Sequence, residues 1–388
     1  MPTLRTTMIN GQRLVSDNMS EVYDVLLPWT DEKFWDFKRV RLRKGSIYVF
    51  GRQHFLDNLP MIRELAETGD YTFVFGNSAE GAWTLESQLK QLRVDELVRQ
   101  GKILVIGGAD LPPEYGILTH EHFLPRILDY EENIQAQQHT EEIFTKTDKP
   151  YKFLFLNGRA RPHRKYLYEK FKRSGVLDHA LWTMLDSKPT IVRHFNFVEN
   201  DINVMATPSP LQRLPDQYEV AQYRDPTFGP IIPDNCFLKQ ELFRREWGEI
   251  YLTPEPYVDT YFSLVTETIC AESPYSFRTE KIAKPLAIGH PFIVVSNAGF
   301  YRDLHRLGFK TFGHVIDESF DLIEHHQDRC DRIVQVVTDL CQQDLASFLQ
   351  ECYTVCKYNQ QRLAELQLEV RQEFPERFAQ YIHERSRV

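Results

Sequence analysis

The chain has 388 residues, 42% of them hydrophobic and 13% aromatic, which is enough apolar surface for folded cores and more than one ordinary domain requires. Its 46 Lys and Arg residues against 55 Asp and Glu residues give a formal net charge of −9, which disfavours nonspecific binding to a polyanion. The N-terminal residues lack the apolar run of a secretory signal, and no stretch reaches the roughly 18–20 apolar residues of a transmembrane helix. We therefore expect a cytoplasmic protein of two domains.

Short β-rich runs alternate with longer amphipathic runs from residue 45 onward, which is typical of βαβ units and a parallel sheet. The predicted strands cover residues 46–51, 71–76 and 102–108, and the predicted helices cover residues 55–66 and 83–99. The polar stretch at residues 130–149 suits a connecting helix and an interdomain linker. Residues 1–149 are therefore expected to form an N-terminal Rossmann-like lobe.

The alternation of strand and helix resumes after this linker. Predicted strands lie at residues 151–156, 260–266 and 291–295, and predicted helices follow the first two of them, ending near Lys172 and Ile288. Residues 186–234 are expected to be irregular or partly antiparallel, and residues 320–385 to form long charged helices. The predicted fold is α/β, with two Rossmann-like lobes facing a central cleft. In this prediction residues 150–345 form the second lobe, and residues 346–388 form a C-terminal helical tail.

The segment from Glu267 to Lys281 follows a predicted strand and enters a predicted helix. Such a loop brings backbone N–H groups and the positive end of a helix dipole together, which favours a phosphate. Lys281 adds a full positive charge, and Glu280 can accept two ribose hydroxyls. The tripeptide Thr279-Glu280-Lys281 also fits an ordinary helix start with Thr279 as its cap. Glu267 is predicted to be a catalytic residue that orients Lys281 or contacts sugar hydroxyls, and a structural salt bridge is the alternative.

A second cluster, Asn157-Gly158-Arg159-Ala160-Arg161-Pro162-His163-Arg164-Lys165, lies where a predicted strand meets a helix. Arg159 and Arg161 precede the helix, so we expect them to contact a diphosphate together with Asn157. Arg164 and Lys165 are expected on a solvated face. Cationic groups of this kind can also neutralise the charge that develops on a diphosphate when it departs as a leaving group.

The run Phe277-Arg278-Thr279-Glu280-Lys281, continuing from Pro285 to Val295, resembles the donor-site motif of the α1,3-fucosyltransferases. In that family an aromatic-x-Thr-Glu-Lys opening leads to a helix that ends in glycine and to a Pro-Val-Val strand. The wider run to Phe320 is similar to uncharacterised bacterial and phage proteins related to glycosyltransferases. The resemblance extends over residues 150–325 and is sharp over residues 260–300.

This resemblance implies that Glu280 binds the ribose, that Lys281 binds the phosphates, and that an Arg after the first strand of the second lobe grips the diphosphate. Arg278 and Thr279 are expected in the same donor site. Phe277 and Arg278 replace the family's usual Tyr and aliphatic pair, so specificity for fucose or guanosine is not implied. The resemblance implies that the two lobes form a glycosyltransferase fold of the GT-B type, in which the second lobe binds the donor and the first lobe binds the acceptor.

The predicted activity is metal-independent glycosyl transfer, of the hexosyl or fucosyl kind, from a nucleotide sugar to a hydroxyl of a surface polysaccharide or lipopolysaccharide. No Asp-x-Asp triplet, phosphate loop, nucleophile elbow or H-E-x-x-H motif occurs, and no cofactor is expected. Glu80, on a glycine-flanked loop after a predicted strand, is the favoured general base, with His54 and Asp110 as alternatives. The nucleotide, the sugar, the stereochemical outcome and the oligomeric state stay open.

Two other functions also fit the sequence. A phage-type DNA glycosyltransferase acting on a hydroxylated base would use the basic stripe Arg39, Arg41, Arg43 and Lys44. A non-catalytic nucleotide-binding module would keep the donor site without the base.

The six cysteines are expected to be buried or incidental thiols, and a metal site or a disulfide is the alternative. Cys352 and Cys356 could share a helix face, but no neighbouring Cys or His pair completes a usual zinc spacing.

Overall fold

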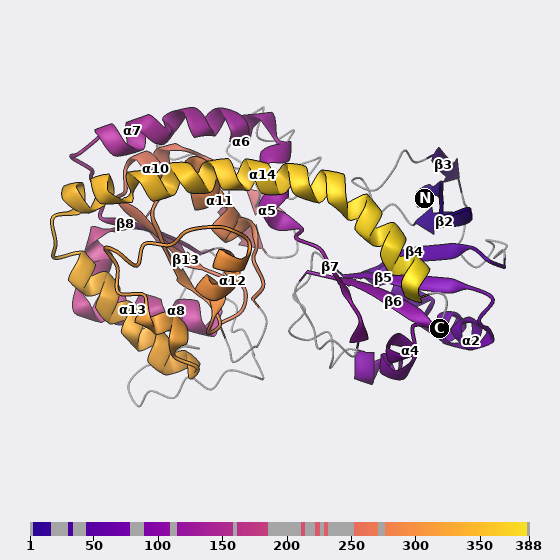
Figure 1. Cartoon of the computed structure of the whole chain (residues 1–388). Coiled ribbons are helices and arrows are strands. Elements are labelled where there is room, and N and C mark those ends of the chain that lie inside the picture. Colours follow the sequence, from indigo (N-terminus) through magenta and orange to yellow (C-terminus); the bar gives the residue numbers. More distant parts are fainter. Residues whose placement is uncertain are drawn as a thin grey trace. The chain divides into compact units, whose positions relative to one another are not determined.

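The computed structural model describes residues 3–16, 30–33, 44–77, 89–108, 115–157, 161–184, 211–213, 222–225, 229–231, 252–270 and 276–385. The chain divides into two compact units. Unit 1 comprises residues 1–122 and 366–388, and unit 2 comprises residues 123–365. Each unit contains a mixed sheet with parallel strands and associated helices, so the predicted α/β fold class is confirmed (Figure 1).

Unit 1 is built on a seven-stranded sheet with the order β3-β1-β2-β4-β5-β6-β7. Its strands are β1 (Thr3–Ile9), β2 (Gln12–Ser16), β3 (Thr30–Lys33), β4 (Ile47–Gly51), β5 (Thr72–Asn77), β6 (Ile103–Gly107) and β7 (Leu118–Thr119). The pairs β2–β4, β4–β5, β5–β6 and β6–β7 are parallel, whereas β1 pairs antiparallel with both β2 and β3. The predicted strands near residues 46, 71 and 102 therefore coincide with β4, β5 and β6.

The hairpin of β1 and β2 was not among the predicted elements. Its turn is Asn10-Gly11, and both residues have positive φ angles, 48° and 77°. Asn-Gly is the preferred dipeptide for a two-residue hairpin turn that needs φ above zero at both positions. The Asn-Gly dipeptide is therefore a sequence signal for this hairpin. It precedes residue 45, where the predicted alternation of strands and helices begins.

Two predicted helices of unit 1 are interrupted for local reasons. Instead of one helix over residues 55–66, the chain forms α1 (Arg52–Asp57) and α2 (Leu59–Thr68), because Pro60 has no N–H to continue a helical ladder. In the described part of the predicted helix 83–99, α4 (Asp95–Arg99) begins only after Arg93, whose φ of 56° lies outside the helical region.

Unit 2 contains a five-stranded sheet with the order β10-β9-β8-β13-β14. Its strands are β8 (Phe153–Asn157), β9 (Ala180–Met184), β10 (Leu211–Arg213), β13 (Phe262–Thr266) and β14 (Phe292–Val295), and β11 (Gln222–Asp225) pairs separately with β12 (Gly229–Ile231). The central strands β9, β8, β13 and β14 are parallel, and β10 is antiparallel to β9. Three of these four central strands were predicted; β9 was not.

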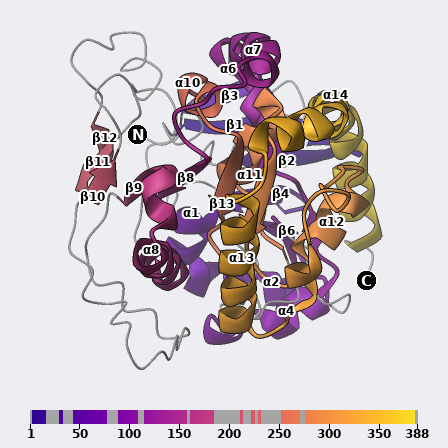
Figure 2. The same cartoon turned by 90° about the vertical axis from the view of Figure 1, so that its left-hand side faces the viewer.

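The helices of unit 2 lie before, between and after its strands in the chain. They are α5 (Phe123–Arg126), α6 (Glu131–Ala136), α7 (Thr140–Thr145), α8 (Pro162–Ser174), α10 (Glu255–Val258), α11 (Glu280–Ile288), α12 (Phe300–Arg306), α13 (His326–Leu340) and α14 (Leu345–Arg385). The Phe171 ring of α8 packs on Phe153 and Phe155 of β8. The helix α8 also contacts α13, and Figure 2 labels both helices. Gly289 ends α11 in the left-handed conformation, with φ 72°, at the predicted turn before β14.

The unit boundaries differ from the predicted domains. Residues 130–149 belong to unit 2, because Gln137 and Thr140 donate to the carbonyl oxygens of Ala287 and Ile288 at the end of α11. The predicted tail also divides: residues 345–365 of α14 belong to unit 2 and residues 366–385 to unit 1. In unit 1, α14 buries Phe374, Phe378 and Ile382 against the sheet. No helix of the described residues is both long and apolar enough to cross a membrane.

Candidate functional site

The carboxyl ends of β8 and β13 are joined in unit 2. The two strands are parallel neighbours, with Phe262 beside Phe153 in register. At their last residues, the Thr266 hydroxyl donates to Oδ1 of Asn157 over 2.7 Å, and both side chains are buried. The loops that follow these strands therefore start side by side at one edge of the sheet, where open α/β sheets bind ligands.

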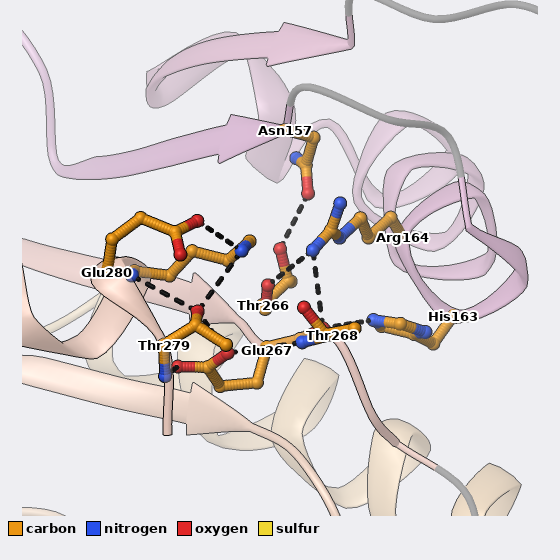
Figure 3. A network of polar contacts seen from close by, with 9 residues as sticks. Asn157, His163, Arg164, Thr266, Glu267, Thr268, Thr279 and Glu280 are labelled. Atoms are coloured by element: carbon orange, nitrogen blue, oxygen red, sulfur yellow. Dashed lines mark hydrogen bonds and ion pairs between the residues drawn. The ribbon is translucent and has the colours of Figure 1, made fainter. Parts of the chain in front are cut away.

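The N-terminus of α8 contributes buried basic side chains to this edge. Arg164 donates to the carbonyl oxygens of Thr266 (2.9 Å) and Glu267 (3.3 Å), and Nε2 of His163 donates to the Glu267 carbonyl (3.0 Å) (Figure 3). Burial, together with the charges of Arg164 and Arg161, holds the pKa of His163 well below its ordinary value, so this imidazole is neutral. Lys165 is also buried, so the prediction of a solvated face for Arg164 and Lys165 is wrong.

Glu267 is the centre of a network that connects β13 to α11. Its side chain is fully buried, and its carboxylate accepts hydrogen bonds from the Thr279 backbone N–H (3.0 Å), the Thr279 hydroxyl (2.7 Å) and the Thr268 backbone N–H (3.1 Å) (Figure 3). Burial raises the pKa of Glu267, against the opposing effect of the Lys281 charge. The carboxylate of Glu267 thereby fixes the position of Thr279, which is the N-cap of α11.

Thr279 is in turn hydrogen-bonded to Lys281. Its backbone is extended at the N-cap of α11, and its hydroxyl accepts from the backbone N–H of Lys281 (3.3 Å) and from the Lys281 ammonium (3.1 Å). In the structure Glu267 is therefore connected to Lys281 through the Thr279 hydroxyl. The Lys281 side chain retains 27% of its exposure.

Glu280 lies next to Lys281 in the first turn of α11. Its side chain is only 5% exposed and forms an ion pair with the Lys281 ammonium. Burial alone would raise the pKa of Glu280, but the charges of Lys281 and Lys284 hold it below its ordinary value, so the carboxylate is ionised at neutral pH. An ionised carboxylate and an ammonium thus stand at the positive end of a helix, where an anion is also favoured.

The other predicted site residues are placed as follows. Arg161 is half-buried at the N-cap of α8, and Arg278 is buried immediately before Thr279. Arg159 and Glu80 lie outside the described residues, as do the alternative base Asp110 and the side chain of His54.

The basic stripe is described only at one of its four residues. Arg39, Arg41 and Arg43 lie outside the described residues, and Lys44 forms an exposed ion pair with Asp70 over 2.7 Å.

Sequence reasoning missed Arg329 of α13, whose guanidinium is buried beneath the site loops. It donates to the carbonyl oxygens of Ser296 (2.8 Å), Cys270 (2.6 Å), Glu324 (2.8 Å) and Ile323. It therefore connects the loops after β13 and β14 to α13. No sequence pattern marks this role, because a single Arg in an amphipathic helix ordinarily reads as solvated.

Comparison with family models, curated proteins and solved structures finds no match for this chain. Within the described ranges no three or more His, Cys, Asp or Glu side chains are grouped to hold a metal ion. The site is therefore interpreted from its own geometry, which combines a helix N-terminus, a partly exposed ammonium and a buried, ionised carboxylate.

Proposed function

We propose that this chain is a metal-independent glycosyltransferase of the GT-B type, in which unit 2 binds a nucleotide-sugar donor and unit 1 binds a hydroxyl acceptor. The observation that carries the proposal is the network of Glu267, Thr279 and Lys281, which holds Glu280 and Lys281 at the start of α11. This start lies next to the joined ends of β8 and β13.

The N-terminus of α11 suits the diphosphate of the donor. Lys281 uses its ammonium to donate to Thr279 and Glu280, and an ammonium has three N–H donors. The remaining donor and the helix dipole both favour a phosphate oxygen. Arg161 at the N-cap of α8, with the predicted Arg159, would neutralise the charge that develops on the leaving diphosphate.

Glu280 suits the ribose of the same nucleotide. A carboxylate accepts hydrogen bonds from vicinal hydroxyls, and in the described residues the side-chain partner of Glu280 is Lys281. The backbone N–H of Glu280 also acts on this carboxylate, and we infer that its remaining lone pairs accept the hydroxyl donors of a ligand. Glu267 acts here as a positioning residue, because its two oxygens are occupied by Thr268 and Thr279.

The general base and the acceptor are proposed from the sequence alone. Glu80 is proposed as the general base that takes the proton of the acceptor hydroxyl, and a glycan of the cell surface is the proposed acceptor class. Slow hydrolysis of a nucleotide sugar by the purified protein would distinguish an enzyme from a nucleotide-binding module. Flow-through on heparin at low salt would count against the DNA-modifying alternative.

The test of the donor site is calorimetry with UDP, GDP, ADP and CDP on wild type, Lys281→Gln and Glu280→Met. We expect one nucleotide to bind wild type and to bind each variant at least about tenfold more weakly, the loss of one charge-assisted contact. Lys357→Gln is the matched control, since Lys357 is half-exposed in an ion pair with Glu141 on α7 and lies on none of the site elements. Equal affinity of wild type and both variants, or no binding of any nucleotide, would refute the proposal.

A further inference from the structure

Two cysteines of unit 2 lie with their sulfur atoms in contact. The Sγ atoms of Cys270 and Cys330 are 3.7 Å apart, and both residues are fully buried. Cys270 follows β13 three residues after Glu267, and Cys330 lies in α13 next to Arg329. The guanidinium of Arg329 also donates to the Cys270 carbonyl, so the loop and the helix are already held together at this point.

The two thiols differ in their electrostatic surroundings. The hydrogen bond with Cys330, aided by the charges of Arg329 and Arg164, lowers the pKa of Cys270 although burial opposes this. The same hydrogen bond and burial raise the pKa of Cys330 well above its ordinary value. This difference favours the Cys270 thiol as the nucleophile and the Cys330 thiol as its protonated partner.

The remaining described cysteines lack such a partner. Burial raises the pKa of Cys341 to about 12, and it raises the pKa of Cys352 and of Cys356 well above the ordinary value. Cys352 and Cys356 lie one turn apart on α14 and are as buried as Cys270. Cys352 and Cys356 therefore show how burial changes the pKa of a thiol that has no hydrogen bond to a second sulfur.

We propose that Cys270 and Cys330 form a reversible oxidation site in which a peroxide converts the two thiols to a disulfide. The Cys270 thiolate attacks one peroxide oxygen, the O–O bond breaks, and water leaves after protonation, giving a sulfenic acid. The Cys330 thiol then attacks the Cys270 sulfur, the S–O bond breaks, and a second water leaves with the Cys330 proton. Two thiols are oxidised and one peroxide is reduced to two waters.

The bond requires a small movement. A disulfide has an S–S length of about 2.05 Å, so the sulfurs at 3.7 Å must approach by about 1.7 Å. Cys330 is inside a helix of 15 residues, whereas Cys270 is in a loop. The loop that carries Cys270 is therefore expected to move more than α13.

The test treats the reduced, full-length protein with hydrogen peroxide, quenches it with N-ethylmaleimide, and maps its peptides by mass spectrometry without reduction. We expect a cross-linked pair of the Cys270 and Cys330 peptides, lighter by two hydrogen atoms than the free peptides and separated again by dithiothreitol. Alkylation of Cys352 and Cys356 in a parallel sample measures how often unit 2 unfolds. The cross-link must form faster than this alkylation.

Two variants complete the experiment. In Cys330→Ser the oxidised Cys270 has no resolving thiol, so it should be trapped as a sulfenic acid by dimedone, with no cross-link. Cys352→Ser is the matched control and should retain the cross-link. The absence of a Cys270–Cys330 cross-link in wild type, or its formation only at the rate of Cys352 and Cys356 alkylation, would overturn the proposal whether or not the variants fold.

Discussion

Replacement of Glu267 by Gln tests whether its carboxylate organises the start of α11. The substitution keeps the size of the side chain and replaces one carboxylate oxygen by an NH2 group. In the structure Oε2 accepts from the Thr268 N–H and from the Thr279 hydroxyl, and Oε1 accepts from the Thr279 N–H. If the amide oxygen of the glutamine keeps the hydrogen bond from the Thr279 N–H, its NH2 group takes the place of Oε2. This NH2 group then faces the Thr268 N–H, and two donors lie opposite each other without an acceptor.

The expected loss of stability follows from these contacts. Hydrogen bonds to a charged group contribute about 1.5–3 kcal/mol each, and two of them are lost. The neutral amide is less costly to bury than a carboxylate, which offsets part of the loss, so we expect a net destabilisation of about 2–4 kcal/mol. For a unit of this size that corresponds to a fall in melting temperature of roughly 4–16 °C.

Differential scanning calorimetry of wild type, Glu267→Gln, Thr279→Ala and the double variant measures this directly. Because the two side chains share a hydrogen bond, their effects should fail to add by at least about 1 kcal/mol. Glu351→Gln, at an exposed glutamate of α14, is the matched control and should leave the melting temperature within about 1 °C. A shift below about 2 °C for Glu267→Gln, or additive effects in the cycle, would refute the reasoning.

Three further substitutions test other parts of the fold. Arg329→Met leaves four carbonyl oxygens without their donor and should destabilise unit 2 by at least about 3 kcal/mol in urea unfolding; an unchanged midpoint would contradict this. Burial lowers the pKa of His290 to about 3, so between about pH 6.5 and pH 3 the unfolded chain binds a proton that the folded chain does not. Stability should therefore fall as pH falls through this range, by up to about 1.4 kcal/mol per pH unit, and His290→Gln should show a shallower fall in acid titrations followed by circular dichroism. Phe378→Ala opens a cavity in unit 1 and should cost about 3–5 kcal/mol, measured as faster hydrogen exchange of β4 and β5; unchanged exchange there would count against the packing of α14 on this sheet.

Six of the strands could be predicted because their apolar runs are short, rich in β-branched and aromatic residues, and bounded by glycine or polar residues. They are β4, β5, β6, β8, β13 and β14. Phe262–Thr266 and Phe292–Val295 are examples, since every residue of both is buried between the layers of unit 2. The helix between them could be predicted from Thr279 as its cap and Gly289 at its end.

The position of residues 130–149 could not be predicted from composition. Their polar side chains read as a solvated linker, but Gln137 and Thr140 satisfy carbonyl oxygens at the C-terminal end of α11. Those carbonyls are unpaired because a helix leaves its last C=O groups without an internal partner. A residue that caps a distant helix in this way has no local signal, because its partner is about 150 residues away in the chain.

The buried cations of the site could not be predicted for a related reason. Arg164 and Arg329 donate to backbone carbonyls at the ends of β13 and β14, and backbone acceptors carry no residue-specific signature. Asn157 and Thr266 were different. Thr266 ends one predicted strand and Asn157 directly follows another, and adjacent parallel strands end at one edge of a sheet. The contact between these two residues therefore follows from the topology.

An ordinary helix start would need only Thr279, which accepts from the Lys281 N–H as an N-cap does. The structure adds a buried carboxylate at Glu267, another at Glu280, and a buried guanidinium at Arg164, each of which is costly to remove from water. Glu267 and Arg164 recover this cost through several hydrogen bonds, whereas Glu280 in the described residues has the Lys281 ammonium as its side-chain partner. Stability alone therefore explains Glu267 and Arg164 better than it explains Glu280. A ligand that brings hydroxyl donors to Glu280 and negative charge to Lys281 would satisfy both, and this is why the donor site is proposed at this helix terminus.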